Sequence, residues 1–326
     1  MKSHGPLPRF LWALAAGAVG APATAQTFPA KPVRVVVGTA AGGGVDAISR
    51  ITGARLAERW PHAIVVENRA GAGGAVASEF VAKSVPDGHT LLTISIAYSV
   101  IPASHRNLGY DPVRDLAPVT VLVNAPNVLV AHPSVPVRTV KGLIALAQSG
   151  RGLDELQYAS SGNGSPAHLA GELLRLLSGA NFVHVPYKGT SPAMTDLIGG
   201  RVSFSFGSIV SSVPHAKTGK LRLLAATGSR RAASLPQTPT IAEEGVAGYA
   251  VDVWYAMLAP AATPRAVMSM LNHEVTRVLH AAEQRERLAD MGLEPVGESL
   301  DASARYIDAE IAKWAKVVRA ARISAQ

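Results

Sequence analysis

Short runs of valine, isoleucine and leucine alternate with helix-length amphipathic segments along most of the chain. The first part shows apolar runs at 33–37, 64–67 and 90–96, separated by helical segments at 45–60 and 72–84. Near-continuous valine and isoleucine is typical of strands covered on both faces, as in a parallel sheet with crossover helices. The pattern therefore predicts an α/β fold.

A second series of the same kind follows and ends in helices. Its expected elements are strands at 119–123, 128–131, 156–159, 181–185, 202–206 and 221–226, helices at 140–148, 166–177, 192–198 and 209–218, an extended segment at 249–259, and helices at 265–281, 283–291 and 302–322. A chain of 326 residues exceeds what one compact core usually holds, so we expect two lobes.

The two predicted lobes are discontinuous in sequence. Extended segments near Val128 and Val251 are placed to carry the chain across from one lobe and back again. The first lobe would then hold residues 27–126 and 251–326, and the second lobe residues 127–250. Ligands of doubly wound sheets bind outside the carboxyl ends of strands, where loops collect. Two lobes that each offer such loops would form a cleft.

Residues 1–26 have the features of a secretory signal peptide. Two basic residues precede an apolar run at 10–20, and the Ala-Thr-Ala sequence at 23–25 offers cleavage near Ala25 or Gln26. The alternative is a retained membrane anchor, but the apolar run is short for a bilayer span and is interrupted by glycine and proline. We expect a mature protein in the periplasm.

Composition narrows the class of protein. Hydrophobic residues make up 48% of the chain and charged residues 17%, which suits a globular protein and argues against disorder. The net charge is +8, but lysine and arginine are scattered and no basic run exceeds Arg230-Arg231, so nucleic-acid binding is not expected. The absence of cysteine excludes disulfides and thiolate metal sites.

A glycine-rich segment after the first predicted strand is the first candidate site. Gly42, Gly44 and Ala47 fit the dinucleotide fingerprint G-x-G-x-x-G/A, and Glu67 closes the next apolar run. Glycines let backbone N–H groups approach a ligand, and the start of the following helix favours an anion. Asp46 suits a helix cap better than a ligand contact.

Two features weigh against a dinucleotide at this segment. A signal peptide sends the protein where nicotinamide cofactors are not normally supplied. A second glycine loop at 70–74 follows Glu67 closely and crowds the place where a ribose would lie. The first glycine segment therefore indicates an anion without fixing its identity, and we expect no cofactor.

Two loops in the second half of the chain are also expected to lie between a strand and the start of a helix. The segment 159–166 follows a strand and opens a helix, with Ser165 placed as its N-cap. The segment 185–192 places Thr190 and Ser191 at the start of its helix. Ser191 does not suit a hydrolase nucleophile, because the next residue, Pro192, lacks the N–H that an oxyanion hole would need.

Histidines and carboxylates indicate neither a metal site nor catalysis. The H-x-H and H-E-x-x-H spacings do not occur, and no pair of carboxylates stands out for acid–base chemistry. His168 lies in the first turn after the serine loop, where it either faces the ligand or packs in the core. We expect a binding protein that is not an enzyme and that holds no metal.

The chain resembles the Bug-type, or TctC-like, periplasmic solute-binding receptors of tripartite tricarboxylate transporters. The resemblance runs from about Phe28 to the C-terminus and rests on the ordered blocks KPVRVVVGTAAGGGVDAISR, VENRAGAGG, PDGHTLL, PNVLVAHPSVPV, YASSGNGSPAHLAGELL, HVPYKGTSPAMTDLIGG, GKLRLLAATGSRR and WYAMLAPAATP. It implies a two-lobed, hinged fold of the type II periplasmic-binding-protein kind, in which each lobe is a mostly parallel sheet flanked by helices. We expect a monomer.

The family resemblance also implies a ligand site. Such receptors grip a small carboxylate between the loop after the first strand and the serine-glycine loops of the other lobe. Carried onto this chain, the site comprises Gly43, Gly44, Val45 and Asp46 on one side and Ser161, Gly164, Ser165, Thr190 and Ser191 on the other. We add Tyr98, His168 and Ser208 as further candidate ligand contacts.

Three departures from the family pattern bear on the ligand. Ala40-Ala41 stand where prolines are common, and the stretch 95–99 differs from a segment often rich in serine and histidine. Gly207-Ser208 occupy a place where an acidic residue followed by asparagine or serine is common. The last change removes a negative charge near the distal end of the ligand. We hypothesise a dianion, or a ligand that lacks a distal ammonium group.

The resemblance implies binding without chemistry. A small organic carboxylate enters the cleft, the lobes close, and the closed form docks on the membrane subunits of a tripartite tricarboxylate transporter. Two alternatives remain open. One is an exported dinucleotide-binding oxidoreductase that uses the glycine fingerprint. The other is a ligand sensor whose closed form addresses a sensor kinase.

Overall fold

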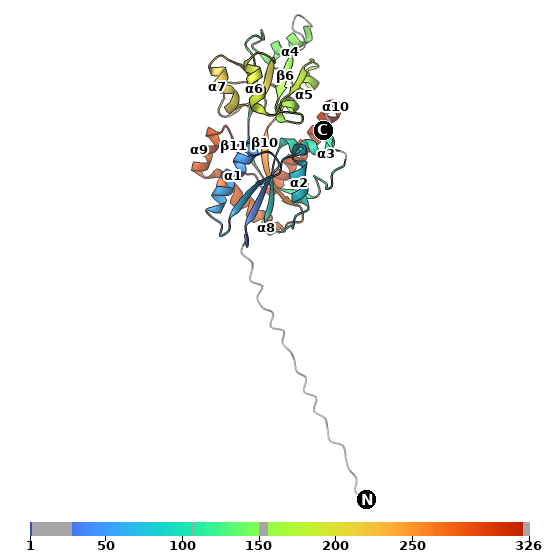
Figure 1. The fold of residues 1–326 in the computed structure, drawn as a ribbon, viewed down its shortest axis with the longest axis vertical. Coiled ribbons are helices and arrows are strands. Elements are labelled where there is room, and N and C mark those ends of the chain that lie inside the picture. Colours follow the sequence, from blue (N-terminus) through green and yellow to red (C-terminus); the bar gives the residue numbers. More distant parts are fainter. Residues whose placement is uncertain (2–27, 106, 150–155, 322–326) are drawn as a thin grey trace.

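Two β-sheets with flanking helices divide the molecule into a lower and an upper lobe in the computed structural model (Figure 1). The structure describes Met1 and residues 28–105, 107–149 and 156–321. The predicted signal peptide lies almost wholly outside these described residues. Among the described residues, no helix is both long enough and apolar enough to cross a membrane.

The first lobe is built on a six-stranded sheet with the strand order β11-β4-β10-β3-β1-β2. Its elements are β1 (Val33–Val37), α1 (Gly44–Ala57), β2 (Ile64–Asn68), η1 (Ala72–Gly74), α2 (Ala75–Ala82), β3 (Thr90–Ser95), η2 (Ile96–Val100), α3 (Ile101–Ser104), β4 (Leu116–Asn124), β10 (Trp254–Pro260), α8 (Arg265–His280), α9 (Ala282–Asp290), β11 (Glu294–Pro295) and α10 (Leu300–Ala321).

The second lobe is built on a five-stranded sheet with the strand order β7-β6-β8-β5-β9. Its elements are β5 (Asn127–Ala131), α4 (Val140–Ser149), β6 (Gln157–Ser160), α5 (Pro166–Ser178), β7 (Val183–Pro186), α6 (Thr190–Ile198), β8 (Phe204–Ser208), α7 (Ile209–Lys217) and β9 (Arg222–Ala226). The α/β, two-lobed fold predicted from the sequence is confirmed.

The expectation of mostly parallel sheets needs one correction. Parallel pairing links β2, β1 and β3 in the first sheet and β7, β6 and β8 in the second. The remaining strands pair antiparallel, so both sheets are mixed. The reason is the crossing of the chain between lobes. Strand β10 enters the first lobe from the side of the second and must run opposite to β1 and β3.

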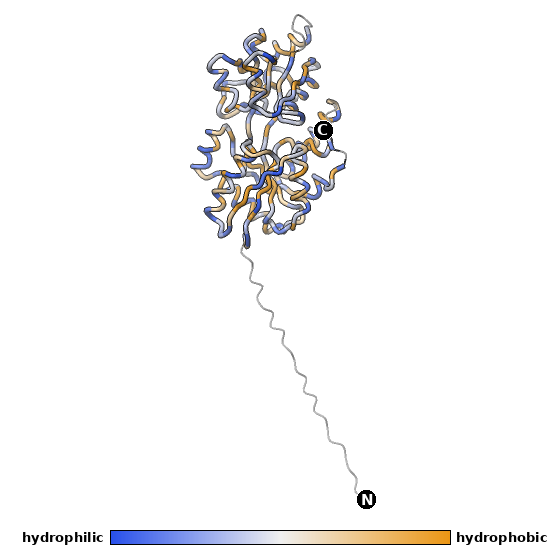
Figure 2. Tube along the Cα trace, viewed as in Figure 1, coloured by the Kyte–Doolittle hydropathy of each residue, from blue (hydrophilic) through white to orange (hydrophobic). Residues whose placement is uncertain are grey.

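Apolar side chains on both faces of the central strands form the core. In β1, Val35, Val36 and Val37 are each at most 1% exposed. Helices α1 and α2 both contact this strand. Figure 2 shows hydrophobic residues concentrated along the strands of the lower lobe. Burial on both faces explains the near-continuous valine in the sequence.

The chain crosses between the sheets twice, and the two crossings are hydrogen-bonded to each other. Ala125 N–H of the first crossing donates to Val253 O of the second at 2.6 Å, and within the second crossing Val251 N–H donates to Thr227 O at 2.8 Å. Helix α10 starts in the first lobe and contacts α5 of the second. Tyr249 extends this junction by donating its hydroxyl to Ala170 O of α5 at 3.2 Å.

Candidate ligand-binding site

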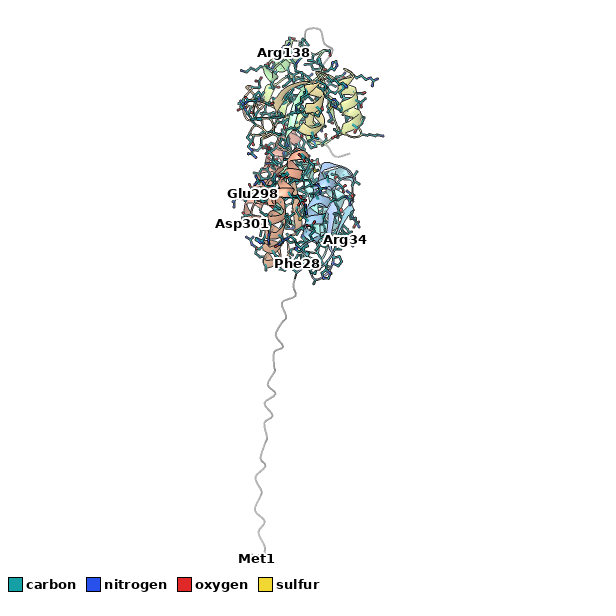
Figure 3. The ribbon with its side chains drawn as sticks, turned by 90° about the vertical axis from the view of Figure 1, so that its left-hand side faces the viewer. Met1, Phe28, Arg34, Arg138, Glu298 and Asp301 are labelled. Atoms are coloured by element: carbon teal, nitrogen blue, oxygen red, sulfur yellow. The ribbon has the colours of Figure 1, made fainter. Side chains whose placement is uncertain are left out.

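The loops singled out from the sequence lie at the edges of the two sheets that face each other. Phe28 and Arg34 lie at the lower end of the first lobe in Figure 3, so β1 runs from there towards the second lobe. In the second sheet, Asn127 follows the crossing directly and pairs with Ser208 at the end of β8. The carboxyl end of β8 therefore lies beside the crossing and faces the first lobe.

The glycine segment of the first lobe ends in an open helix start. Gly43 is the N-cap of α1 and offers no side chain to the first helical turn. Gly43 and Gly44 are exposed, whereas the side chain of Val45 is buried beneath them. The first N–H groups of a helix have no partner within the helix. An anion from outside can therefore take these donors, as the sequence indicated.

Asp46 orients this segment from below. Its carboxylate accepts hydrogen bonds from Gly42 N–H at 2.9 Å, from Arg50 Nε at 3.1 Å and from Asn68 Nδ2 at 2.9 Å. The hydrogen bond from Arg50 is the main cause that holds the pKa of Asp46 down at about 2. Both carboxylate oxygens are thus occupied by the protein. Asp46 fixes the loop and is not free to bind a cation on a ligand.

Three loops of the second lobe meet at one sheet edge. Strands β7, β6 and β8 are neighbours, and the loops that follow them open α6, α5 and α7 respectively. Ser161, Gly164 and Ser165 lie between β6 and α5, and Thr190 and Ser191 are the first residues of α6. The structure therefore brings the predicted residues of this lobe together, because parallel neighbours end at the same edge.

Ser208 completes this edge as the N-cap of α7. Its hydroxyl accepts from Ser211 N–H at 3.2 Å and lies 2.8 Å from Ser211 Oγ. The side chain is exposed. A pair of uncharged hydroxyls therefore follows Gly207, which stands where the family pattern often has an acidic residue.

Two stacked histidines support the serine-glycine loop from behind. His168 Nδ1 accepts from Gly164 N–H at 2.9 Å, and His184 Nε2 lies 2.6 Å from Ser160 Oγ. The two rings stack with centroids 4.0 Å apart. Burial, together with His168, lowers the pKa of His184 to about 4, and burial lowers the pKa of His168. Both rings are therefore neutral at pH 7, and His168 supports the loop backbone.

Tyr98 is the predicted site residue that the structure places elsewhere. It is 1% exposed, and its hydroxyl donates to Pro112 O. The cause is the tight turn η2 directly after β3, which turns this side chain into the core. Tyr98 is therefore removed from the candidate ligand contacts.

Tyr255 of β10 is a residue that sequence reasoning missed. Its hydroxyl oxygen lies only 2.5 Å from the position that a Cβ on Gly44 would occupy. The preceding residue, Trp254, is fully buried and points to the other face of the sheet. Side-chain alternation along β10 was readable from the sequence, but the pairing that brings Tyr255 beside α1 was not.

Two surface hollows lie away from these loops. One of about 450 Å³ is lined by residues of the second lobe that include Pro133, Val213 and Leu235. Another, of about 440 Å³, lies between α4 and the segment 244–247. Neither contains a predicted site residue. Within the described ranges, no group of three or more histidine and acidic residues could hold a metal ion.

The fold and these facing loops define a two-lobed solute-binding protein. The model of the tripartite tricarboxylate transporter family receptor, TctC, matches residues 48–323. The chain therefore belongs to this receptor family, and the resemblance noted in the sequence is confirmed.

Relatives and solved structures agree with this assignment. Protein BugT of Bordetella pertussis is 34% identical over 312 residues, which are 94% of this chain and 94% of BugT. The structure of Rpa4515 from R. palustris with adipate has a TM-score of 0.79 and 36% identity, covering 91% of this chain and 99% of that one. The structure of MatC from Rhodopseudomonas palustris with bound malate has a TM-score of 0.75 and 33% identity, covering 89% of this chain and 100% of that one.

Proposed function

We propose that this protein is an extracytoplasmic receptor that captures a small dicarboxylate between its lobes and delivers it to a tripartite tricarboxylate-type transporter. The observation that carries the proposal is the pair of facing sheet edges. One presents the open start of α1, capped only by Gly43, and the other presents the starts of α5, α6 and α7. Helix starts and hydroxyls on opposite sides suit a ligand with a carboxylate at each end.

The lobe boundaries follow from the same arrangement. We assign residues 27–126 and 251–326 to the first lobe and residues 127–250 to the second. All strands of the first sheet lie within 33–124 and 254–295, and all strands of the second lie within 127–226, which supports this division. The hinge then consists of the two hydrogen-bonded crossings.

The site favours binding over chemistry. Asp46 is already paired with Arg50, and His168 and His184 are held neutral within the loop support. These groups orient backbone donors and do not offer a free acid or base to a ligand. We therefore propose a receptor without a catalytic step, without a cofactor and without a metal.

The dinucleotide alternative is disfavoured by two contacts. Glu67, the acid of the fingerprint, already pairs with Arg69 at 2.6 Å and lies 3.6 Å from Arg34. The two glycine loops also touch, since a Cβ on Gly38 would lie 3.2 Å from the Cα of Gly74. The acid that should bind a ribose is therefore already engaged by arginines.

Two relatives support the choice of ligand class. Adipate and malate, named with the two similar structures, are dicarboxylates. In this chain Gly207 and Ser208 stand at the carboxyl end of β8, and the hydroxyl pair Ser208–Ser211 adds no negative charge. A second ligand carboxylate is therefore acceptable at this end. Tighter binding of a cationic amino acid than of any dicarboxylate would contradict the choice.

Localisation and partners complete the proposal. The N-terminal pattern and the family both support export to the periplasm, where we propose that the receptor acts as a monomer. The membrane subunits of the transporter would recognise the closed form. A sensor kinase is the alternative partner of the same form, and pull-down with each candidate in the presence and absence of ligand would separate the two.

The first experiment is a ligand panel read by thermal unfolding. Monocarboxylates, adipate, malate, tricarboxylates, acidic amino acids and NAD would each be added to the purified protein. A ligand at one hundred times its dissociation constant stabilises the folded form by about 2.7 kcal/mol, which raises the midpoint by several degrees. A rise with dicarboxylates supports the receptor. A rise with NAD alone would support the oxidoreductase and contradict the proposal.

A further inference from the structure

We propose that the hydroxyl of Tyr255 donates a hydrogen bond to the ligand carboxylate held at the start of α1, and that it is therefore a specificity-determining contact of the site. The inference rests on the proposed receptor function. Tyr255 is not among the residues that the family resemblance implied.

The position of Tyr255 is fixed by β10. Tyr255 is paired with Ser95, the last residue of β3, so it lies at the edge of the first sheet that faces the second lobe. A Cβ added to Gly44 would meet the hydroxyl oxygen of Tyr255 at 2.5 Å and its Cζ at 3.1 Å. The hydroxyl thus occupies the place of the missing side chain at the first residue of α1, beside the free N–H groups of the first turn.

The hydroxyl of Tyr255 has no partner within the protein. Among the residues that the structure describes, none donates to it or accepts from it. The hydroxyls of Tyr98, Tyr158 and Tyr249 have partners, whereas that of Tyr110 is buried without one. Tyr255 is only partly buried, so its hydroxyl is accessible to a group from outside the protein. Thr39 Oγ1, in the loop before α1, is buried and has no partner among the described residues. The unpaired hydroxyls of Tyr255 and Thr39 lie beside the start of α1, whose first N–H groups are also free. This arrangement indicates that a ligand forms hydrogen bonds with them.

The charges around Tyr255 decide what that ligand group is. Burial raises the pKa of Tyr255, so the hydroxyl keeps its proton and can act as a donor. The nearest carboxylate of the loop, Asp46, already accepts from Gly42, Arg50 and Asn68. Donors from the tyrosine and from the helix start therefore converge on one place. Only a group with acceptors, of which a carboxylate is the strongest, satisfies both.

The test is the substitution Tyr255→Phe in the full chain, with Tyr306→Phe as the matched control. Tyr306 packs against Trp254 at 6.1 Å between ring centroids, on the face of β10 away from α1. Calorimetry with adipate and malate would give the dissociation constants. Loss of a hydrogen bond to a charged group predicts a roughly 10- to 100-fold weaker affinity in Tyr255→Phe. Tyr306→Phe should bind like the wild type.

The unfolding temperature of the unliganded protein supplies a second readout, which distinguishes a ligand contact from a structural role of the hydroxyl. Because the substitution removes an unpaired hydroxyl, Tyr255→Phe should unfold at the same temperature as the wild type or higher. Tyrosine labelled with 13C at Cζ would report contact directly. The resonance that Tyr255→Phe lacks should shift when adipate is added to the wild type.

Each outcome assigns the failure to one proposal. If the wild type binds adipate or malate and Tyr255→Phe binds the same ligand with equal affinity, the tyrosine contact is overturned. The receptor function is then unaffected. A less stable unliganded variant would give the hydroxyl a structural role and would also overturn the contact. A wild type that binds no carboxylate of the panel overturns the receptor function, and this inference falls with it.

Discussion

Asp46 has the function of a positioning residue although it stands inside the most suggestive motif of the sequence. It follows the glycines of the fingerprint, yet its contacts are all internal and hold Gly42, Arg50 and Asn68 in one cluster. Its side chain is 6% exposed and that of Arg50 is half exposed. A single buried carboxylate therefore couples the glycine loop, α1 and β2.

Substitution of Asp46 by asparagine should destabilise this cluster. The pKa of Asp46 lies near 2, below its usual 3.8, so the ionised form stabilises the fold above about pH 4 and this contribution is lost as the pH falls towards 2. At pH 7 we expect Asp46→Asn to lower the free energy of unfolding by roughly 2 kcal/mol and to weaken carboxylate binding. Urea unfolding would measure the first effect.

A matched control separates this cluster from ordinary surface pairs. Asp301 pairs with Arg265 at 3.0 Å, but both side chains are more than 60% exposed. Asp301→Asn should therefore change the free energy of unfolding by less than about 1 kcal/mol. Equal effects of the two substitutions would show that the burial of Asp46 has no special role.

The histidine pair predicts how stability depends on pH. The pKa of His184 is about 4 in the folded protein and lies below the usual 6.5, so the unfolded chain binds the proton first. Stability should fall as the pH drops from about 6.5 to about 4. The variant His184→Gln should have a lower free energy of unfolding than the wild type at pH 8. Its free energy of unfolding should fall less than that of the wild type when the pH is lowered. His273, whose side chain is 71% exposed, offers a control for the substitution itself, since His273→Gln should leave the free energy of unfolding at pH 8 near that of the wild type.

Glu310 of α10 is the centre of a buried cluster of side chains that holds strand β10 against helix α10. Its carboxylate accepts from Trp254 Nε1 at 3.1 Å and from Trp314 Nε1 at 3.0 Å, and it pairs with Lys313. Trp254 and Trp314 are fully buried. The cluster joins α10 to the first residue of β10, immediately before Tyr255.

Removal of this carboxylate should therefore affect both the fold and the site. We expect Glu310→Ala to lower the free energy of unfolding by about 2–4 kcal/mol, because two indole N–H groups lose their acceptor and Lys313 loses its charge partner. Carboxylate affinity should fall with it, since β10 carries Tyr255. Denaturant unfolding followed by tryptophan fluorescence would measure the loss. Glu283, whose side chain is 77% exposed, provides the control Glu283→Ala, which should stay near wild type.

The local pattern of hydrophobic and polar residues was sufficient to predict most helices and strands. It was insufficient to predict which strands pair with each other. Valine-rich runs and glycine or serine loops predicted the strands and helix starts, because burial and capping leave direct marks on sequence. The segment 249–259 was expected to be extended throughout, but it pairs as a strand only from Trp254, since residues before it belong to the crossing. The sequence pattern could not show whether Tyr98 or Tyr255 lies at the candidate site. Which tyrosine meets the glycine loop depends on β10 pairing with β3.

The architecture of the whole molecule supports a hinge rather than a rigid pair of lobes. Besides the two crossings and α10, the lobes touch at a few polar and apolar points. Arg230 pairs with Glu294 at 3.0 Å, and Ala233 N–H donates to the same carboxylate at 2.9 Å. A Cβ on Gly292 would lie 2.7 Å from the Val210 side chain. Contacts of this kind are easily remade when one lobe rotates on the other.

Ligand binding should therefore compact the molecule. A ligand shifts the equilibrium between open and closed lobes only by its differential affinity for the two forms. Since the proposed site has donors on both lobes, a dicarboxylate satisfies all of them only when the lobes approach. Small-angle X-ray scattering should show a smaller radius of gyration at saturating adipate or malate than without ligand, and no change with a compound that does not raise the unfolding temperature. An unchanged radius at saturation would show that the ligand is held by one lobe alone, and delivery by closure would have to be abandoned.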